Sequence, residues 1–203
     1  FNVSEKTPIG LYFDDFDNNG TKEQILTYFV EGKEICFNNH EELLKQIPIL
    51  KKRYLFAADF AKCSVQDIIG SHSNKLIKSQ ANNLGSFLFE NDGKNHFSPK
   101  ELPYQTQLSP IKSILQVNYN NDDLPDLLLA GNYYHNNIQM GRYDADYGCV
   151  LLNKGNLQFE YLKVNNKLLN NEIRKLSEIK IKNKSCVLVG INNDAVKVLT
   201  LNK

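Results

Sequence analysis

Short apolar runs separated by turn residues dominate most of the chain. Runs of about five residues that end in Asn, Asp or Gly are typical of strands in antiparallel sheets. The predicted strands span 11–13, 25–30, 86–89, 113–117, 126–130, 149–152, 159–162, 178–181, 186–189 and 196–199. This regular spacing of short strands predicts an all-β protein of the sandwich, barrel or propeller kind.

Residues 38–80 depart from this strand pattern, because apolar residues in the first half of the segment recur at helical spacing. Pro48 suits the first turn of a second helix. Ser64 followed by Asp67 resembles a capping box, and Gly70 suits a helix end. We therefore predict a helical insertion in a β protein, with packing as its main role.

Two kinds of hairpin alternate along the chain. An Asp/Asn-rich loop joins strands at 12–30 and 115–130, and an Asn-x-Gly type turn lies within 89–97 and 152–159. Such alternation is typical of four-stranded propeller blades, which need about 45 residues each and at least about four blades to close a ring. The prediction is one domain over 1–203 that forms an incomplete propeller. Its first blade is 9–37 plus 82–103 with the insertion at about 38–80, its second is 111–165, and a partial third is 173–203.

The loop at residues 15–23 has the ligand pattern of a calcium site. Oxygen-bearing side chains occupy its first, third, fifth and ninth positions, and alternate residues of a tight loop can converge on one cation. Leu26 replaces the bidentate acid of an EF-hand, so a strand–loop–strand site fits better, with a plain Asx-rich hairpin as the alternative. The expected ligands are Asp15, Asp17, Asn19 and Glu23 with the backbone carbonyl of Thr21.

A second loop, at residues 118–126, repeats this pattern with less charge at the four ligand positions, −2 where the first loop has −3. Its first position is neutral, and its sixth is Asp123 where the first loop has a glycine. Since ligand charge tunes calcium affinity, the second site should be weaker. Its expected ligands are Asn118, Asn120, Asp122 and Asp126 with the carbonyl of Leu124. A third, shorter echo at 192–194 is predicted to be only a turn.

Composition excludes several classes of function. Lys and Arg total 24 and Asp and Glu total 23, so the net charge of +1 argues against a general nucleic-acid binder. No apolar run approaches the roughly 18 residues that span a bilayer. The chain contains no GxSxG, P-loop, HExxH or GxGxxG motif, so we expect no catalysis. Without an initiator Met, the chain is expected to be part of a longer protein.

The four cysteines, Cys36, Cys63, Cys149 and Cys186, show no CxxC spacing. Most lie in apolar runs, where a thiol usually behaves as a small hydrophobe. We expect free thiols, with a disulfide as the alternative, and no zinc site at Cys36 and His40 because a second ligand pair is lacking.

The segment at residues 133–137 is aromatic and polar, as ligand-facing loops often are, and Arg142 with Asp144 and Asp146 could anchor it. A long connection held by a local ion pair is the alternative. In a competing interpretation, Asp144 and Asp146 near Arg142 would serve as acid and base of a polysaccharide hydrolase or lyase. The candidate ligand-binding residues are Tyr133, Tyr134, His135 and Arg142.

Four segments, 15–27, 107–111, 124–134 and 140–148, resemble the FG-GAP/VCBS-type repeats of propeller proteins. The resemblance is closest to the last blades of bacterial secreted or outer-membrane proteins with UnbV/cartilage-acidic-protein-like domains. It implies a β-propeller fold, calcium in the loops, an extracytoplasmic location and a binding or scaffolding role. The expected partners are a protein or glycan ligand and the rest of a larger propeller. Open sheet edges could also pair with one another.

Overall fold

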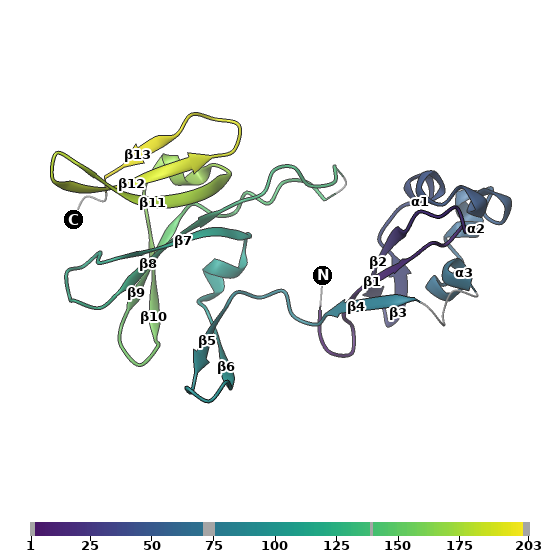
Figure 1. Ribbon diagram of the computed structural model, residues 1–203, viewed down its shortest axis with the longest axis horizontal. Coiled ribbons are helices and arrows are strands. Elements are labelled where there is room, and N and C mark those ends of the chain that lie inside the picture. The colour runs from purple at the N-terminus through teal and green to yellow at the C-terminus, as the bar shows by residue number, and fades with distance from the viewer. Residues whose placement is uncertain (1–2, 71–75, 139, 201–203) are drawn as a thin grey trace. The chain divides into compact units, whose positions relative to one another are not determined.

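The computed structural model describes residues 3–70, 76–138 and 140–200 (Figure 1). The chain divides into two compact units, Phe1–Leu84 and Gly85–Lys203. Antiparallel strands dominate both units, and the helical segment belongs to the first.

The first unit contains a four-stranded antiparallel sheet with the strand order β3-β2-β1-β4. The β1–β2 register pairs Asp14 with Glu23, so the loop between these residues lies at the end of that hairpin. The β2–β3 turn uses Glu31 and Gly32, both at positive φ, which matches the twist of the flanking strands. The strands are β1 (Ile9–Asp14), β2 (Glu23–Val30), β3 (Lys33–Cys36) and β4 (Ile77–Ala81).

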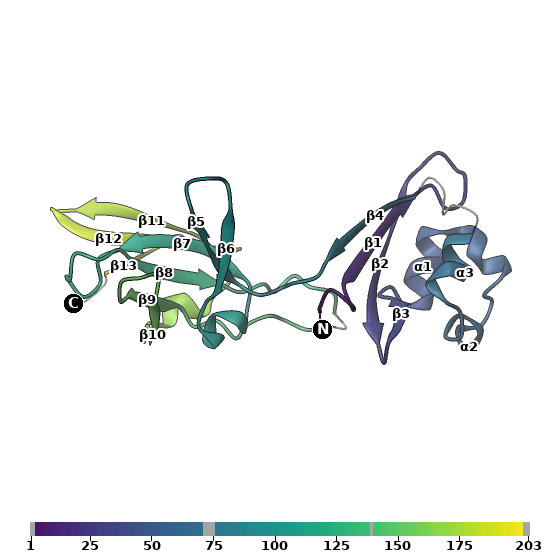
Figure 2. The same cartoon turned by 90° about the horizontal axis from the view of Figure 1, so that it is seen from below.

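Short helices cover one face of this sheet (Figure 2). They are α1 (His40–Gln46), the 3-10 helix η1 (Pro48–Lys52), α2 (Ala57–Phe60) and α3 (Val65–Ile69). The predicted capping box of Ser64 and Asp67 is confirmed, and Gly70 ends α3 at a φ of 60°. The predicted insertion is therefore helical in several short segments between residues 40 and 69, and its residues 71–75 lie outside the described ranges. Its last residues instead form β4, an exposed edge strand with no apolar run to mark it in the sequence.

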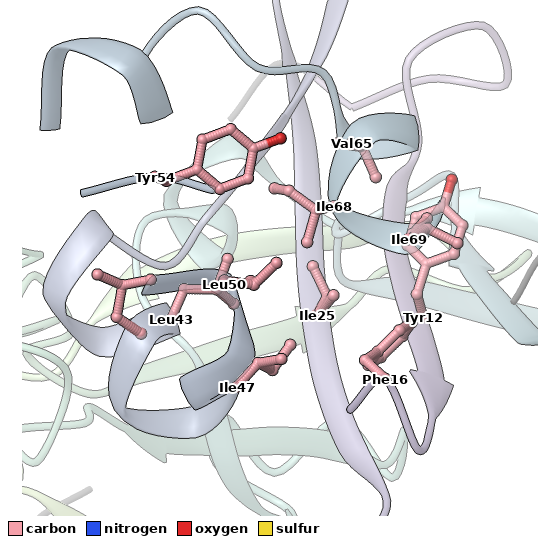
Figure 3. Close-up of a cluster of buried hydrophobic side chains, with 11 residues drawn as sticks. Tyr12, Phe16, Ile25, Leu43, Ile47, Leu50, Tyr54, Val65, Ile68 and Ile69 are labelled. Carbon is pink, nitrogen blue, oxygen red and sulfur yellow. The ribbon is translucent and has the colours of Figure 1, made fainter. Parts of the chain in front are cut away.

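The core of the first unit lies between the sheet and these helices (Figure 3). Side chains from β1 and β2 meet side chains from α1, η1 and α3, so burying apolar surface holds the helices on the sheet. The buried members are Tyr12, Phe16, Ile25, Leu43, Leu44, Ile47, Leu50, Tyr54, Val65, Ile68 and Ile69.

The second unit contains three antiparallel sheets. The hairpin of β5 (Phe87–Asn91) and β6 (Phe97–Glu101) leads through the 3-10 helix η3 (Tyr104–Gln107) into a four-stranded meander. The meander has the order β10-β9-β8-β7, and after the 3-10 helix η4 (Lys167–Asn170) a three-stranded sheet has the order β11-β12-β13. These strands are β7 (Ile111–Val117), β8 (Asp126–Gly131), β9 (Cys149–Asn153), β10 (Phe159–Lys163), β11 (Ile173–Ile181), β12 (Lys184–Ile191) and β13 (Lys197–Leu199).

The meander and the three-stranded sheet share one hydrophobic cluster. Strands β7 and β11 also meet directly, where the backbone N–H of Leu176 donates to Ser113 Oγ at 2.8 Å. The buried members of the cluster are Leu128, Ala130, Val150, Val164, Leu169, Ile173, Leu176, Val187, Val189 and Leu199.

The predicted antiparallel β architecture is confirmed at the level of small sheets, two of them four-stranded. No propeller is detected within the described ranges 3–70, 76–138 and 140–200. The sheets also differ from the predicted first blade, because β4 completes the first sheet while β5 and β6 pair only with each other. No helix of the described chain is long and apolar enough to cross a membrane.

All four cysteines are free thiols in the structure. Burial raises the pKa of Cys149 to about 12 and that of Cys36 to about 11. Thiolates at neutral pH are therefore rare at both positions, as expected for cysteines that serve as packing residues.

Candidate functional site

The first acidic loop, residues 15–23, connects β1 to β2. Asp15, Asp17 and Glu23 each offer a carboxylate oxygen, and these oxygens all lie within 4.8 Å of one another. Two oxygens that bind one Ca²⁺ at about 2.4 Å can be no more than about 4.8 Å apart, so the spacing fits this ion. Three carboxylates this close repel one another, and a divalent cation would offset that repulsion.

Backbone N–H groups hold these carboxylates in place. Asn19 N and Gly20 N donate to the two oxygens of Asp15 at 2.9 and 2.8 Å. Phe16 N donates to Glu23 Oε2 at 2.9 Å, and Glu23 is only 6% exposed. A carboxylate oxygen has more than one lone pair, so these bonds leave acceptor capacity for a cation.

The second acidic loop, residues 118–126, connects β7 to β8 and repeats the hydrogen bonds made by the fifth and ninth positions of the first loop. At its ninth position Asp126 accepts the N–H of Tyr119 at 2.8 Å, just as Glu23 accepts that of Phe16. At its fifth position Asp122 accepts the N–H of Leu124 at 2.9 Å. In the first loop the corresponding bond runs from Thr21 N to Asn19 Oδ1 at 2.7 Å.

The backbone bends at the same places in both loops. The fourth position has positive φ in each, 57° at Asn18 and 60° at Asn121. The sixth position does too, with 88° at Gly20 and 62° at Asp123. The two loops therefore share one conformation, although the sixth residue is a glycine in one and an aspartate in the other.

The second loop has two carboxylates at its expected ligand positions, where the first loop has three, and both of them already accept backbone N–H groups. Fully buried Asp126 also accepts Asn153 N, at 2.8 Å, through its other oxygen. Hydrogen bonds from Leu124 N and the Asn120 side chain lower the pKa of exposed Asp122. Within the described part of the chain, only the first loop brings three acidic side chains to one point. Asn118, a predicted ligand, contributes no charge there.

The described residues of the connection between β8 and β9, 132–138 and 140–146, form a projection (Figure 1). Its base is closed by Asn132, which is fully buried. The Asn132 side chain donates to Asp146 O at 2.8 Å and accepts Asp146 N at 2.9 Å. Further out, Tyr133 and Tyr143 exchange two backbone hydrogen bonds of 2.8 and 2.9 Å. The projection is therefore a hairpin-like element with a fixed base.

The candidate ligand-binding residues lie along this projection. The Arg142 guanidinium lies over the Tyr134 ring at 5.1 Å, and Tyr134 donates its hydroxyl to Asn170 O at 2.9 Å. His135 Nδ1 is 3.3 Å from Glu172 Oε2. The structure thus gathers the four predicted residues on one element: Tyr133, Tyr134, His135 and Arg142.

Sequence patterns missed two residues that organise this surface, Asn132 and Glu172. Glu172 is only 1% exposed, and its Oε1 forms an ion pair with Arg174 Nη2 at 2.8 Å. The geometry of this pair is not that of a hydrogen bond. Burial pushes the pKa of Glu172 upward, but hydrogen bonds from Asn192 and the Tyr134 backbone, with nearby positive charge, lower it overall. Glu172 stands in no recognisable motif, and Asn132 lies in the repeat-like segment 124–134 without being marked as a site residue there, so the folded arrangement reveals both roles.

The carboxylates of the competing hydrolase interpretation differ in their surroundings. Asp144 is exposed, whereas Asp146 is half-buried and its Oδ1 accepts Gly148 N at 2.8 Å. Burial raises the pKa of Asp146. Asp146 thus contributes to the base of the projection through both its backbone and its side chain.

A scan against protein-family models found no matching family. Searches of curated proteins and of solved structures likewise found no match. The functional argument therefore starts from the loops and the projection themselves.

Proposed function

We propose that this chain is a calcium-stabilised, non-catalytic binding module that works outside the cytoplasm. The observation that carries the proposal is the shared conformation of the two acidic loops, one of which brings three carboxylates within 4.8 Å. Each loop follows a strand directly and returns into the next, so an ion there would fix the ends of a hairpin. Metal binding would then contribute to folding.

Calcium suits this site better than other common ions. Its expected donors are carboxylates, an amide and a backbone carbonyl, all hard oxygen ligands. Magnesium requires near-ideal octahedral geometry, which a loop with mixed donors supplies poorly. The modest ligand charge fits the weak calcium affinities of extracellular modules, and this favours an extracytoplasmic location.

The projection is the candidate contact surface for a protein or glycan ligand. It carries exposed aromatic and cationic groups on a fixed base, which lowers the ordering cost of binding. The four-stranded β7–β10 meander would serve as a blade of a larger propeller completed by other parts of the protein. In that assembly the module supplies recognition and scaffolding, and it needs no nucleophile.

Thermal unfolding with calcium or with a chelator tests the metal proposal. We expect the melting temperature of the wild type to rise by several degrees in millimolar calcium relative to EGTA, because a ligand that binds only the folded state stabilises it. Magnesium should give a smaller rise. Asp17→Asn should lose most of the calcium effect while Asp194→Asn, in the short turn at 192–194, should keep it. Equal melting temperatures with and without calcium would refute the proposal.

The hydrolase or lyase remains the competing proposal, favoured by the raised pKa of Asp146, since a general acid needs such a shift. Turnover of soluble polysaccharides by the wild type, lost in both Asp144→Asn and Asp146→Asn, would support it. A wild type without turnover would leave the binding module as the better account.

A further inference from the structure

A groove in the second unit lies between the second acidic loop and the β11–β12 hairpin. Strands β7 and β11 meet at Ser113 and Leu176, and the groove is lined by residues that follow this point along both strands. Figure 1 shows the second acidic loop and the β11–β12 turn at the same end of the unit. The space between them has a volume of about 720 Å³, within the usual range for a small-molecule site.

The lining of this groove combines apolar and polar side chains. Leu115, Val117 and Val187 supply aliphatic surface, and Tyr119 adds an aromatic ring. The polar side chains are amides, a hydroxyl and two carboxylates, contributed by Gln116, Asn118, Asn121, Asp123, Glu178 and Ser185. No Lys or Arg occurs among the described residues that line the groove.

We propose that this groove is a second binding surface, separate from the projection, and that it binds a neutral oligosaccharide; this inference rests on the binding role proposed above. Sugar hydroxyls both donate and accept hydrogen bonds, so they can pair with carboxylates and with amides. Aromatic and aliphatic surface can cover the apolar faces of sugar rings. The two carboxylates repel acidic glycans, since no cation of the lining offsets their charge.

The position of the groove also links saccharide binding to calcium. One wall consists of residues of the second acidic loop, including Asn118, Tyr119 and Asp123. An ion held by that loop would order this wall before the ligand arrives, and thereby strengthen ligand binding. By thermodynamic reciprocity, a bound oligosaccharide would raise the calcium affinity of the second loop by the same factor.

The test titrates the ¹⁵N-labelled chain with neutral oligosaccharides and follows backbone amide shifts. The probes are cellohexaose, maltohexaose, mannohexaose, xylohexaose and chitohexaose in millimolar calcium, with hexalysine and oligogalacturonate as charged probes. We expect saturable shifts centred on the groove for at least one neutral probe. Glu178→Gln should weaken that binding about tenfold, as expected for loss of a charged hydrogen-bond acceptor. Asp123→Asn should act in the same direction.

Glu160→Gln, on edge strand β10 and paired with Lys154, is the matched control and should bind like the wild type. Three outcomes would overturn the proposal: no saturable shift with any neutral probe, binding of hexalysine alone, or shifts confined to the projection. Calorimetric titration of calcium alone separates the two proposals. Calcium binding without saccharide binding would refute only the proposed saccharide site. Absence of calcium binding would refute the proposed function itself.

Discussion

The two acidic loops share a backbone conformation but differ in charge. Both place positive φ at the fourth and sixth positions, and in both the ninth-position acid accepts the N–H of an aromatic residue at the second position. Yet Asp15 begins the first loop and neutral Asn118 begins the second. The shared conformation therefore does not require an acid at the first position, and the charge of that position is free to differ in its effect on metal affinity.

The ninth-position acids also differ in how much of the fold depends on them. Glu23 accepts the N–H of Phe16 beside the first core, and it contributes to the acidic group of its loop. Asp126 is fully buried and accepts two backbone N–H groups, from Tyr119 and Asn153. Asp126 is thus mainly a structural acceptor that joins two turns, whereas Glu23 is positioned to act as a ligand as well.

Removing the ninth-position acid should change the free energy of unfolding more than the other substitutions do, and it should distinguish the two roles. In EGTA, Asp126→Ala leaves two N–H groups without their acceptor and should reduce the free energy of unfolding by about 3 kcal/mol. Glu23→Ala leaves one N–H group without its acceptor and should reduce the free energy of unfolding by about half as much. Urea unfolding followed by circular dichroism measures both. Asp126→Asn retains one acceptor and should lie between Asp126→Ala and the wild type; equal losses in the two alanine variants would contradict the distinction.

Adding charge to the second loop should make it resemble the first as a metal site. Asn118→Asp restores the first-position acid and should raise the calcium affinity of this loop about tenfold, because ligand charge tunes affinity. Calorimetric titration in an Asp17→Asn background isolates the second loop. Asn183→Asp adds the same charge in the β11–β12 turn and should leave the affinity unchanged. If both variants gain equally, the gain reflects net charge alone.

The sixth position tests whether the shared bend limits stability. Gly20 has a φ of 88° with open space around its Cα, so Gly20→Ala should lose about 1 kcal/mol through backbone strain alone. Asp123 already adopts a φ of 62°. Asp123→Gly relieves strain but loosens the unfolded chain, so its net change should be within about 0.5 kcal/mol. Chemical unfolding in EGTA measures both, and a larger loss for Asp123→Gly than for Gly20→Ala would show that Asp123 makes a stabilising contact.

Much of this arrangement follows from local sequence patterns. Alternating apolar runs with Asx-rich ends predicted the strands on both sides of each acidic loop, because turn residues and strand residues have distinct conformational preferences. The capping box of Ser64 with Asp67 was likewise readable, since its hydrogen bonds span only three residues. The proximity of Asp15, Asp17 and Glu23 was predicted for the same reason.

Features that depend on distant partners could not be predicted in this way. Strand β4 has no buried position and exists because its backbone pairs with β1. Asn132 and Glu172 acquire their roles from residues far along the chain, such as Asp146 and Asn192. The separate pairing of β5 with β6 is also hard to foresee, because repeated hairpins specify local pairing and leave the pairing and packing between hairpins undetermined.

The smallest expected effect concerns the pH response of Asp122. Hydrogen bonds from Leu124 N and Asn120 lower its pKa, so its ionised form stabilises the fold. This contribution is present above the pKa of the unfolded chain and is lost as the pH falls through the lower folded pKa. A carboxyl ¹³C titration in EGTA should give a pKa below the ordinary aspartate value, and an ordinary or raised value would contradict the hydrogen-bonded geometry. Calcium should lower the apparent pKa further, because the ion competes with the proton for the same oxygens. An unchanged pKa in millimolar calcium would show that the second loop keeps the shared conformation without binding the ion.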